Sequence, residues 1–471
     1  MFGKMFPMLS GEVKKEPPLK IDRVEQSAIV QLLTKQRPEA IPAPNKPITV
    51  AIIGAGMRGK GYAYYALENR KWMRVVAVAE PVNARRQRLA EDHHIPNEHV
   101  FEDWRELARL PKFCDAVVIC TLDSQHFEPA IAFADLKYHI LLEKPMAPSL
   151  QECYEITRAA LRNQVVFTIA HVLRYTAHNR VINQMIDSGV LGDIINIQHV
   201  EPVGFWHFAH SYVRGNWRKE SESSFSLMTK SCHDIDLIAQ WMHSPCVRIS
   251  SFGNLTHFKR ENKPEEAGKA TRCLECAHEK NCQYSAKSIY LDPASRGQKM
   301  WPISVLADVV DIESVDKALR EGPYGRCVYE CDNDVVDHQV VNMEFASGAT
   351  ASCTMVAFTK SVCVRETKIF GTKGQLDCDG MDSIRFDDFV TGTREVLTPS
   401  KITGMFDMRG HGGGDIALVE AFLKEIATVS TRDGATEAFN SHLYVFAAEH
   451  ARRTGQVVNI EQFKQQHQIN I

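Results

Sequence analysis

Short apolar runs alternate with helix-like segments between residues 47 and 172. Uniformly apolar runs bounded by glycine or charged residues are typical of strands buried on both faces of a parallel sheet. Such runs lie at 48–53, 75–80, 115–120, 138–145 and 165–173. Helical spacing is found near 82–92, 103–110, 124–136 and 149–162. Strand alternating with helix predicts a parallel sheet covered by helices on both faces.

Beyond about residue 172 the pattern changes. Partial alternation of apolar and polar positions is typical of strands with one buried and one open face. It occurs at 193–201, 247–254, 335–345 and 348–358, without a helix between each pair. Helical segments follow near 415–428 and 436–453. These features predict an α+β domain built on a large open, mostly antiparallel sheet.

The composition narrows the possible function classes. The 471 residues carry a net charge of −3, with 24% charged and 44% hydrophobic residues, which is typical of a globular enzyme. This balance predicts neither a nucleic-acid partner nor an anionic membrane partner. The start, MFGKMFPMLSGEVKKE, is too weak for a signal peptide, and no later stretch is apolar enough to span a bilayer. The 13 cysteines, scattered through apolar runs, predict reduced thiols and a cytoplasmic protein.

A glycine-rich turn follows the first apolar run. The sequence GAGMRG places Gly54, Gly56 and Gly59 in the G-x-G-x-x-G spacing, with Met57 and Arg58 between them. Glycines at this spacing let the backbone turn tightly and approach a pyrophosphate, which the N-terminus of the next helix attracts. Because the turn joins a predicted strand to a predicted helix, we interpret it as a dinucleotide-binding loop. A fortuitous glycine turn is the alternative.

Glu80 ends the second predicted strand, about 20 residues beyond Gly59. An acidic side chain there can accept hydrogen bonds from the adenosine ribose hydroxyls, which favours NAD. NADP stays open because an arginine among Arg85, Arg86 and Arg88 could fold back and receive a 2′-phosphate. A solvated helix face is the interpretation that we prefer for these arginines.

One histidine separates a small-residue run from an apolar helical run in LMTKSCHDIDLIAQWM (227–242). Apolar residues recur at helical spacing over 234–242, which predicts a helix buried on one face. His233 would lie at the entry of that helix, where it can face a cleft, and Asp236 one turn on could bond it. The local pattern alone fits either a catalytic base or a core histidine.

The segment LLEKP (141–145) resembles the signature of the glucose–fructose oxidoreductase / inositol dehydrogenase / rhizopine-catabolism superfamily, usually written Gfo/Idh/MocA. The segment TLDSQHFEPAIAFA (121–134) resembles the strand-to-helix segment that precedes this signature, and GAGMRG and CHDID occur in the expected order. The resemblance covers about residues 47–455. These motifs are specific for the superfamily and carry no information about the substrate.

The resemblance implies an N-terminal Rossmann domain and a C-terminal domain whose open sheet often serves in oligomer contacts, so we expect a homo-oligomer. It implies that Lys144 lies beside the nicotinamide and that His233 is the general acid/base. It further implies that the cofactor is lined by Thr121, Asp123, His126 and Glu143. Hydride transfer from a secondary alcohol needs a base for the hydroxyl proton and a cation for the developing alkoxide, and imidazole and lysine suit these roles.

We therefore divide the chain into an arm (1–46), an NAD(P)-binding Rossmann domain (47–172) and a C-terminal substrate-binding and oligomerisation α+β domain (173–471). The overall class is α/β. The arm is polar and proline-rich at both ends, and RVEQSAIVQLLTKQ within it could form a short amphipathic helix. That helix would pack on the body or on a partner subunit, and disorder is the alternative.

The chain departs from the family pattern just before His233. Many members carry an acid four residues before the histidine, where this chain has Thr229, followed by Lys230. A threonine can bond a sugar hydroxyl or the imidazole, but it cannot act as an anionic orienter. Lys230 becomes a candidate for substrate binding or proton transfer, with a solvated side chain at a helix entrance as the alternative.

Polar and aromatic residues near the cleft are further candidates for the substrate site. Arg174 and Tyr175 follow the last predicted strand of the Rossmann domain, where the carboxyl edge of the sheet faces the cleft. The segment EPVGFWHFAHSYVRGNWR (201–218) is dense in rings. It fits either a carbohydrate face that includes His207 or a buried aromatic core. We assign Trp217, in the same segment, to the cofactor.

Two residues close to the last pair of helices complete the candidate substrate site. The glycines of RGHGGGD (409–415) could let this loop approach the cleft, with His411 touching substrate. Asp415 is predicted to be the N-cap of the helix that follows. Asp236, on the helix after His233, is the other candidate.

Cysteines are concentrated in one polar loop and shortly after it. The segment RCLECAHEKNCQYS places Cys273, Cys276 and Cys282 in a C-x2-C-x5-C array, and GRCVYEC adds Cys327 and Cys331. Thiolates at this density resemble a structural zinc site with four tetrahedral ligands. We take Cys327 as the fourth ligand and Cys331 as the alternative. Plain reduced cysteines or a redox pair would also explain the array.

These features predict an enzyme that transfers hydride between NAD(P) and a secondary hydroxyl of a sugar, inositol or related polyol. A second enzyme hypothesis uses the same residues, because some members of the superfamily cleave glycosidic bonds by transient oxidation and recycle NAD. The third hypothesis is a regulator that binds NAD(P) as a sensor without turnover. Retention of Lys144 and His233 argues against this regulator, and Thr229 argues weakly for it.

Overall fold

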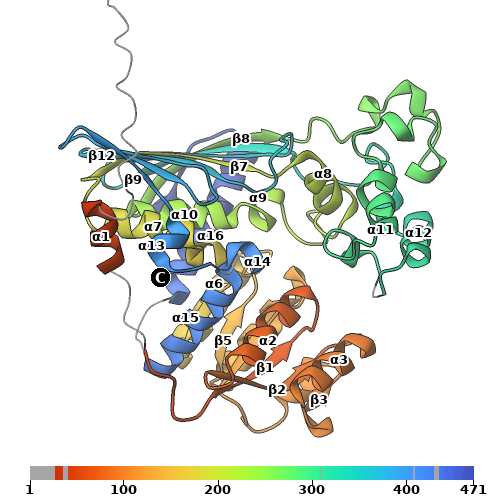
Figure 1. The fold of residues 1–471 in the computed structure, drawn as a ribbon, viewed down its shortest axis with the longest axis horizontal. Helices are drawn as coiled ribbons and strands as arrows, with labels where there is room; N and C mark the ends of the chain where they lie inside the picture. Colours follow the sequence, from red (N-terminus) through yellow and green to blue (C-terminus); the bar gives the residue numbers. More distant parts are fainter. Residues whose placement is uncertain (1–26, 36–40, 308, 407–408, 429–433) are drawn as a thin grey trace, which may run out of the picture.

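The computed structural model describes residues 27–35, 41–307, 309–406, 409–428 and 434–471 (Figure 1). In Figure 1 the N-terminal domain lies below a broad sheet, with a layer of helices between them. Helix α16 (Gly434–Thr454) belongs to this layer and contacts both β6 of the lower sheet and β8 of the upper one. One cluster of buried apolar side chains therefore serves both domains, from Val50 to Leu443.

Six parallel strands form the N-terminal sheet in the order β3-β2-β1-β4-β5-β6. The strands are β1 (Ile48–Ile53), β2 (Met73–Ala79), β3 (Val100–Phe101), β4 (Ala116–Ile119), β5 (His139–Leu142) and β6 (Phe167–Ile169). Every residue of β4 is buried, as its uniformly apolar sequence predicts, and every residue of β6 is buried as well. The strand order reverses between β1 and β4, and such sheets bind ligands beyond the carboxyl ends of the strands at that point.

Helices connect these strands and cover the sheet. They are α2 (Met57–Glu68), α3 (Asn83–His93), α4 (Trp104–Ala108), α5 (Phe127–Asp135) and α6 (Leu150–Asn163), with 3-10 turns at η2 (Asn97–His99) and η3 (Asp123–Gln125). Helix α6 begins after Ser149, whose hydroxyl accepts a hydrogen bond from the Glu152 backbone N–H. The predicted helices at 82–92, 124–136 and 149–162 are each found within a few residues of these bounds.

Nine strands form the C-terminal sheet in the order β14-β13-β12-β11-β7-β10-β9-β8-β15. They are β7 (Ile194–Pro202), β8 (Cys246–Asn254), β9 (His338–Phe345), β10 (Thr350–Val356), β11 (Glu366–Gly371), β12 (Gly374–Cys378), β13 (Ile384–Asp388), β14 (Thr393–Leu397) and β15 (Val458–Asn459). Neighbours run antiparallel except β7 and β10, which pair in parallel. The prediction of a mostly antiparallel sheet is confirmed.

The helices of the second domain lie mainly between the two sheets (Figure 1). They are η4 (Val172–Tyr175), α7 (Ala177–Asp187), α8 (Phe205–Phe208), η5 (Ala209–Arg214), α9 (Ser226–Thr229), α10 (Cys232–Met242), α13 (Pro399–Thr403), α14 (Arg409–Gly412), α15 (Gly414–Thr428), α16 and α17 (Ile460–Gln466). Helix α10 is buried along most of its length and contacts β7, β10 and α16. This packing fixes the position of His233 in its first turn.

A turn-rich segment between β8 and β9, here called the lobe (255–337), projects to one side of the broad sheet in Figure 1. Its elements are η6 (Arg260–Asn262), η7 (Glu265–Ala267), η8 (Cys273–Glu275), η9 (Glu279–Asn281), η10 (Lys287–Leu291), α11 (Asp292–Ser295), η11 (Ile303–Val305), α12 (Ile312–Glu321) and η12 (Pro323–Gly325). Small apolar clusters separate from the main core support it. The sequence pattern did not predict this lobe or strands β11–β14.

The predicted arm includes a short helix that packs on the body. Helix α1 (Ala28–Lys35) buries Ile29 and Leu33 and contacts α7 and α13. The flanking stretches 1–26 and 36–40 lie outside the described residues. Along the described ranges, no helix combines the length and the apolar composition that a membrane crossing requires.

The shared core gives a direct test of the fold. Leu443 in α16 is 0% exposed, whereas Leu161 on the outer face of α6 is 41% exposed. We expect Leu443→Ala to lower the free energy of unfolding by about 2–5 kcal/mol, because the truncation leaves a cavity in the core. Leu161→Ala should change it by about 0.5 kcal/mol or less. Urea denaturation measures both, and equal losses would contradict the central position of α16.

Candidate active site

The glycine loop joins β1 to α2 with little space to spare. Gly54 has a φ of +90°, and a Cβ there would come within 2.6 Å of the Cys120 carbonyl oxygen. A Cβ on Gly59 would lie 1.9 Å from the Gly54 carbonyl oxygen. At Gly56, by contrast, no described atom lies within 4 Å of the Cβ position. The loop is therefore tight on the protein side and open on the side from which a pyrophosphate would approach, and Met57 at 56% exposure borders it.

Glu80 lies at the end of β2, where the sequence predicts it, but its carboxylate is already hydrogen-bonded within the protein. Its two oxygens accept hydrogen bonds from the backbone N–H groups of Ala55 (2.7 Å) and Val82 (2.9 Å). Arg86 folds back to this point and donates to the carbonyls of Glu80 and Pro81. This contact corrects the preferred interpretation of Arg86 as a solvated side chain. The negative charge of Glu80 therefore favours NAD, whereas Arg86 lies where it could receive the 2′-phosphate of NADP.

The turn after β4 connects the two domains through Asp123. One carboxylate oxygen of Asp123 accepts hydrogen bonds from the Trp217 indole N–H (2.9 Å) and the Ser223 hydroxyl (2.6 Å). Thr121 donates from its hydroxyl to the Gln125 carbonyl at 3.2 Å. Asp123 and Trp217, both predicted near the cofactor, thus hold the C-terminal domain against this edge of the Rossmann sheet.

His126 is placed differently from the prediction that it lines the cofactor. Its side chain is 0% exposed, and its ring nitrogens lie 2.8 Å from the Pro145 carbonyl oxygen and 3.2 Å from that of Thr121. The ring therefore ties the turn after β4 to the turn after β5. The ring thus supports the predicted cofactor site from inside the protein and is not exposed to it.

Lys144, directly after β5, reaches across the domain boundary. Its ammonium donates to the Thr229 carbonyl oxygen at 3.0 Å and lies 5.4 Å from the centre of the Trp217 ring. Its backbone N–H donates to a carboxylate oxygen of Glu143 at 2.8 Å. Thr229 therefore serves this site through its backbone carbonyl, since its hydroxyl bonds only the carbonyls one turn earlier in α9.

Arg58 joins three distant segments of the chain. Its guanidinium pairs with Glu143 (2.5 Å) after β5 and with both carboxylate oxygens of Asp415 (2.8 and 3.0 Å) in α15. The Tyr62 hydroxyl donates to Glu143 at 2.7 Å. Burial would raise the pKa of Glu143, but the positive charges of Arg58 and Lys144 outweigh this effect and lower it. Arg58 and Glu143, which were both predicted to contact the cofactor, thus stabilise the glycine loop through contacts within the protein.

Asp415 is not the N-cap that the sequence predicts. Helix α15 begins at Gly414, so Asp415 lies inside its first turn, where it pairs with Arg58 and lies 2.9 Å from a ring nitrogen of His411. Burial would raise its pKa, but the hydrogen bonds from His411 and Arg58 hold it well below its usual value. His411, predicted to touch substrate, is 47% exposed and is oriented by this carboxylate.

His233 lies in the first turn of α10 and is 6% exposed. Its Nδ1 atom is buried without a hydrogen-bond partner in the structure. Burial, followed by the positive charge of Lys144, lowers its pKa well below the usual value. The imidazole is therefore neutral at neutral pH and can accept a proton. Lys144 and His233, from different domains, are close enough to influence one another electrostatically.

The sequence suggested a hydrogen bond between Asp236 and His233, and the structure does not contain it. It pairs with His171 at 2.9 Å and receives two hydrogen bonds from Arg174, at 2.6 and 2.7 Å. Arg174 also pairs with Glu437 at 3.0 Å, so its charge is used within the protein. The rings of His171 and His233 lie 5.7 Å apart. Asp236 and Arg174 thus support the packing around the histidine, and their predicted contact with substrate stays a prediction.

The alternative prediction for Lys230, a solvated side chain at a helix entrance, is wrong. Its ammonium, on a side chain only 11% exposed, lies 3.3 Å from Glu201 and 2.9 Å from the Cys363 sulfur. Burial would lower its pKa, but Glu201 and Cys363 outweigh this and raise it. Lys230 is therefore a fixed cation near neutral pH and is unsuited to act as a base.

A buried charged cluster lies beside Lys230 and was missed by sequence reasoning. Arg365, near the start of β11, pairs with Glu201 (2.5 Å) and with Asp234 (3.0 Å). His199 lies 3.0 Å from the same Asp234 oxygen. These residues come from β7, α10 and the turn before β11, so no local motif contains them. The only signal in the sequence was the presence of charged residues within strands of alternating polar and apolar positions.

An aromatic wall lies next to this cluster. His207 contacts the Trp301 ring edge-on with centroids 4.9 Å apart, and Trp206 lies 5.3 Å from the same ring. The Cys363 sulfur lies 3.2 Å from a ring nitrogen of His207, and burial, with the charge of Lys230, lowers the pKa of His207 well below its usual value. Trp301 belongs to the lobe, so the lobe completes the predicted aromatic face. Tyr175 is half-buried and lies 6.0 Å from the Arg180 guanidinium.

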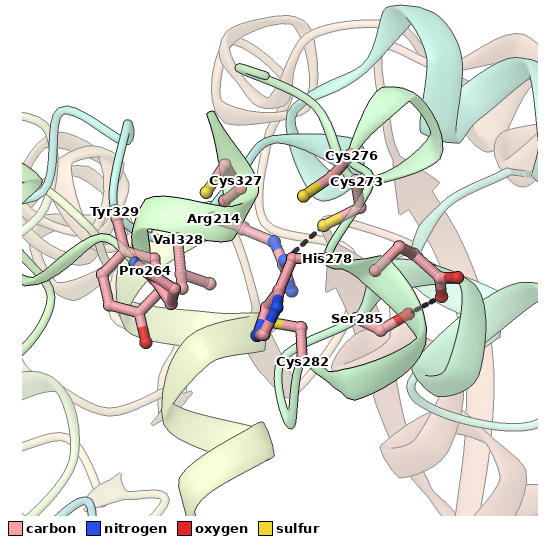
Figure 2. A pocket seen from close by; sticks show the side chains of 12 residues that line it. Arg214, Pro264, Cys273, Cys276, His278, Cys282, Ser285, Cys327, Val328 and Tyr329 are labelled. Atoms are coloured by element: carbon pink, nitrogen blue, oxygen red, sulfur yellow. Dashed lines mark hydrogen bonds between the residues drawn. The ribbon is translucent and has the colours of Figure 1, made fainter. Parts of the chain in front are cut away.

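The predicted zinc ligands lie around one small cavity in the lobe. Cys273, Cys276, Cys282 and Cys327 all line it, together with Arg214, and Cys331 does not (Figure 2). Within the described residues, no three His, Cys, Asp or Glu side chains are placed to hold a metal ion as they stand. The zinc site therefore stays a prediction, although the cysteines do gather as the array suggests.

Two family models match most of the chain. The first, described as an oxidoreductase family with an NAD-binding Rossmann fold, matches residues 48–171, and the second, the C-terminal alpha/beta domain of an oxidoreductase family, matches residues 183–429. The chain belongs to the Gfo/Idh/MocA oxidoreductase family. The Gfo/Idh/MocA resemblance of LLEKP and GAGMRG is thereby confirmed, as is the predicted fold class.

Individual Gfo/Idh/MocA relatives are distant. The oxidoreductase YteT of Bacillus subtilis (strain 168) is 24% identical over 352 residues, covering 71% of this chain and 77% of YteT. A 2,7-anhydro-N-acetylneuraminate hydratase of Mediterraneibacter gnavus is 25% identical over 213 residues, covering 45% of this chain and only 54% of the hydratase. A levoglucosan dehydrogenase solved with NADH and levoglucosan is 18% identical, with a TM-score of 0.62, covering 88% of this chain and 100% of that one. The likeness to the levoglucosan dehydrogenase shows the fold alone.

The Arg58 pairs predict how stability depends on pH. The folded-state pKa of Asp415 is depressed below its unfolded value near 3.9, so its contribution is present above that pH and lost as pH falls through the folded value. Each unit of depression is worth about 1.4 kcal/mol. Asp415→Asn should therefore show a smaller loss of unfolding free energy between pH 7 and pH 3 than the wild type, measured by urea denaturation. The exposed-site variant Asp92→Asn should match the wild type, and an unchanged pH dependence in Asp415→Asn would refute the assignment.

Proposed function

We propose that this family member transfers hydride between NAD(P) and a secondary hydroxyl of a sugar, inositol or related polyol. The observation that carries the proposal is the approach of Lys144, from the Rossmann domain, to a neutral His233 from the C-terminal domain. The bound nicotinamide would accept or supply the hydride. All other chemistry of the reaction belongs to the side chains around it.

His233 is suited to take the hydroxyl proton. Burial and the nearby Lys144 keep the imidazole neutral, so it is ready to act as a base at neutral pH. Once it carries the proton, the nearby charges of Lys144 and Arg365 favour its release. The same histidine therefore serves as the acid in the reverse direction.

Lys144 is suited to stabilise the alkoxide that forms as the proton leaves. Among the described residues its ammonium has no carboxylate partner and donates only to the Thr229 carbonyl. Its charge is therefore available to a developing negative oxygen in a partly buried site, where such interactions are strong. The Trp217 ring beside it restricts access by water.

The lining favours a neutral polyol over a charged substrate. Lys230 and Arg365 are neutralised by Glu201 and Asp234, so they add no net charge. Rings of the aromatic wall, with His207, suit the apolar faces and hydroxyls of a sugar. The levoglucosan dehydrogenase with the same fold is consistent with this substrate class.

A distant relative of this chain is named a hydratase, which favours an NAD-dependent glycosidase as a second candidate function. In such an enzyme a ring carbon would be oxidised only transiently, the acidified neighbouring C–H would allow elimination, and NAD would be recycled. A glycosidase of this kind would need the same Lys144 and His233. It differs from a dehydrogenase in leaving no net NADH.

Substitution of the two residues tests the proposal. Lys144→Ala and His233→Asn should each lower turnover of a sugar panel with NAD by at least about 100-fold, since each removes charge stabilisation or proton transfer. Lys60→Ala, on the exposed face of α2, is the matched control and should keep wild-type turnover. NADH absorbance distinguishes the dehydrogenase from NAD-dependent cleavage without NADH. Tight cofactor binding without any turnover in the wild type would instead indicate the sensor.

Cofactor choice is tested separately. Because Glu80 would face a 2′-phosphate, we expect NAD to bind at least about tenfold more tightly than NADP in fluorescence titrations. Arg86→Ala should leave NAD binding within twofold of the wild type, as should Arg88→Ala on the exposed side of α3. Tighter binding of NADP, lost in Arg86→Ala alone, would reverse the assignment.

A further inference from the structure

The lobe contains a cavity of about 20 Å³, roughly the space that one water or one small ion occupies. In Figure 2 cysteine side chains from three parts of the lobe surround this space: Cys273 and Cys276, Cys282, and Cys327. An antiparallel β-bridge between Arg272 and Arg326 holds the chain segments that carry Cys273 and Cys327 together. None of the cysteines forms a disulfide.

A buried positive charge lies at the same cavity without an acidic partner. The Arg214 side chain is 0% exposed, and among the described residues no carboxylate pairs with it. Its guanidinium donates to the Cys273 sulfur (3.2 Å) and to the carbonyls of Tyr284 and Arg326 (both 2.8 Å), while Nη1 has no partner. A buried, always-charged guanidinium without a counter-charge is strongly unfavourable.

Neutral thiols cannot supply the missing negative charge. The four cysteines that line the cavity are free, and a free thiol carries no charge. Binding of a metal ion would deprotonate them, because thiolates are the ligands that coordinate zinc. One ion held by four thiolates carries two net negative charges, which Arg214 would partly offset.

We propose that this cavity binds one structural zinc ion through Cys273, Cys276, Cys282 and Cys327, with Arg214 as the cation that partly offsets the negative charge of the thiolates. As the side chains stand they do not converge on one point, so binding requires the thiols to rotate into the cavity. His278 also lines the cavity and lies in front of Cys282 in Figure 2, where it can shield the ion from water.

The zinc would connect the lobe to the substrate face. Arg214 ends η5, the turn that carries His210, and His210 contacts the rings of Trp301 and Tyr324 with centroids 5.4 and 4.8 Å apart. A filled site therefore fixes one end of the aromatic wall. Its role is to hold the wall in place, and no step of the hydride transfer passes through it.

Metal analysis of the full-length protein tests this proposal without relying on activity. Protein purified from zinc-supplemented cells should contain about one zinc per chain by plasma mass spectrometry. Cobalt(II) reconstitution after chelation should give the intense near-ultraviolet thiolate absorption and visible bands of a tetrahedral site. Folded wild-type protein with less than about 0.1 zinc per chain and no such cobalt spectrum would refute the proposal, as would iron with broad absorption near 400 nm.

Single substitutions locate the ion. Cys276→Ser and Cys282→Ser should each lower the zinc content at least fivefold, whereas Cys114→Ser, at a buried cysteine of the Rossmann domain, should leave it unchanged. Zinc retained fully in both lobe variants would overturn the ligand assignment. If a lobe variant fails to fold, the metal content and cobalt spectrum of the wild type still decide the question.

Discussion

The pairing of Arg58 is the interaction on which the candidate site depends most. It holds the glycine loop, the Glu143 turn and the start of α15 at one point, although these segments are far apart in sequence. Removing one partner of a fully buried pair typically costs about 3–5 kcal/mol, and the cost here is smaller because the Arg58 side chain is 30% exposed. Because Glu143 precedes Lys144 directly, the position of Lys144 is also set by this pair.

Charge balance explains how the rest of the site works. Arg174 and Arg365 are buried against carboxylates, so they shape the site without adding charge to it. Lys144 is different, because among the residues that the structure describes its ammonium meets only a carbonyl and a ring, so no carboxylate neutralises its charge. The same rule, applied to the lobe, draws attention to Arg214, whose surroundings offer sulfur in place of carboxylate.

Sequence patterns predicted the parts of the structure whose causes are local. Strand β4 was predicted because a strand buried on both faces must be apolar throughout, and Gly59 because any side chain there would collide with the loop. Strand β14 was missed because four of its five residues are at least partly exposed, which weakens the alternation. The Arg365–Glu201 pair joins residues that are far apart in the sequence of the domain, so no short window of sequence contains it.

The same limit applies within the site. His233 was found through motif order, but its support by His171 and Asp236 depends on the packing of α10 against the turn after β6. The expected Asp236–His233 bond failed because Arg174 and His171 approach that carboxylate from another element. Spacing along a helix shows which residues share a face, but it does not show which neighbour occupies that face.

The lobe begins and ends at one point of the sheet. Asn254 and His338 are opposite each other in the β8–β9 pairing, so the chain leaves and returns at adjacent positions. Long insertions at such a point cost little chain entropy, because closure depends only weakly on length. The lobe is therefore a replaceable module: exchanging it would alter the substrate face near Trp301 while leaving Lys144, His233 and the hairpin register intact.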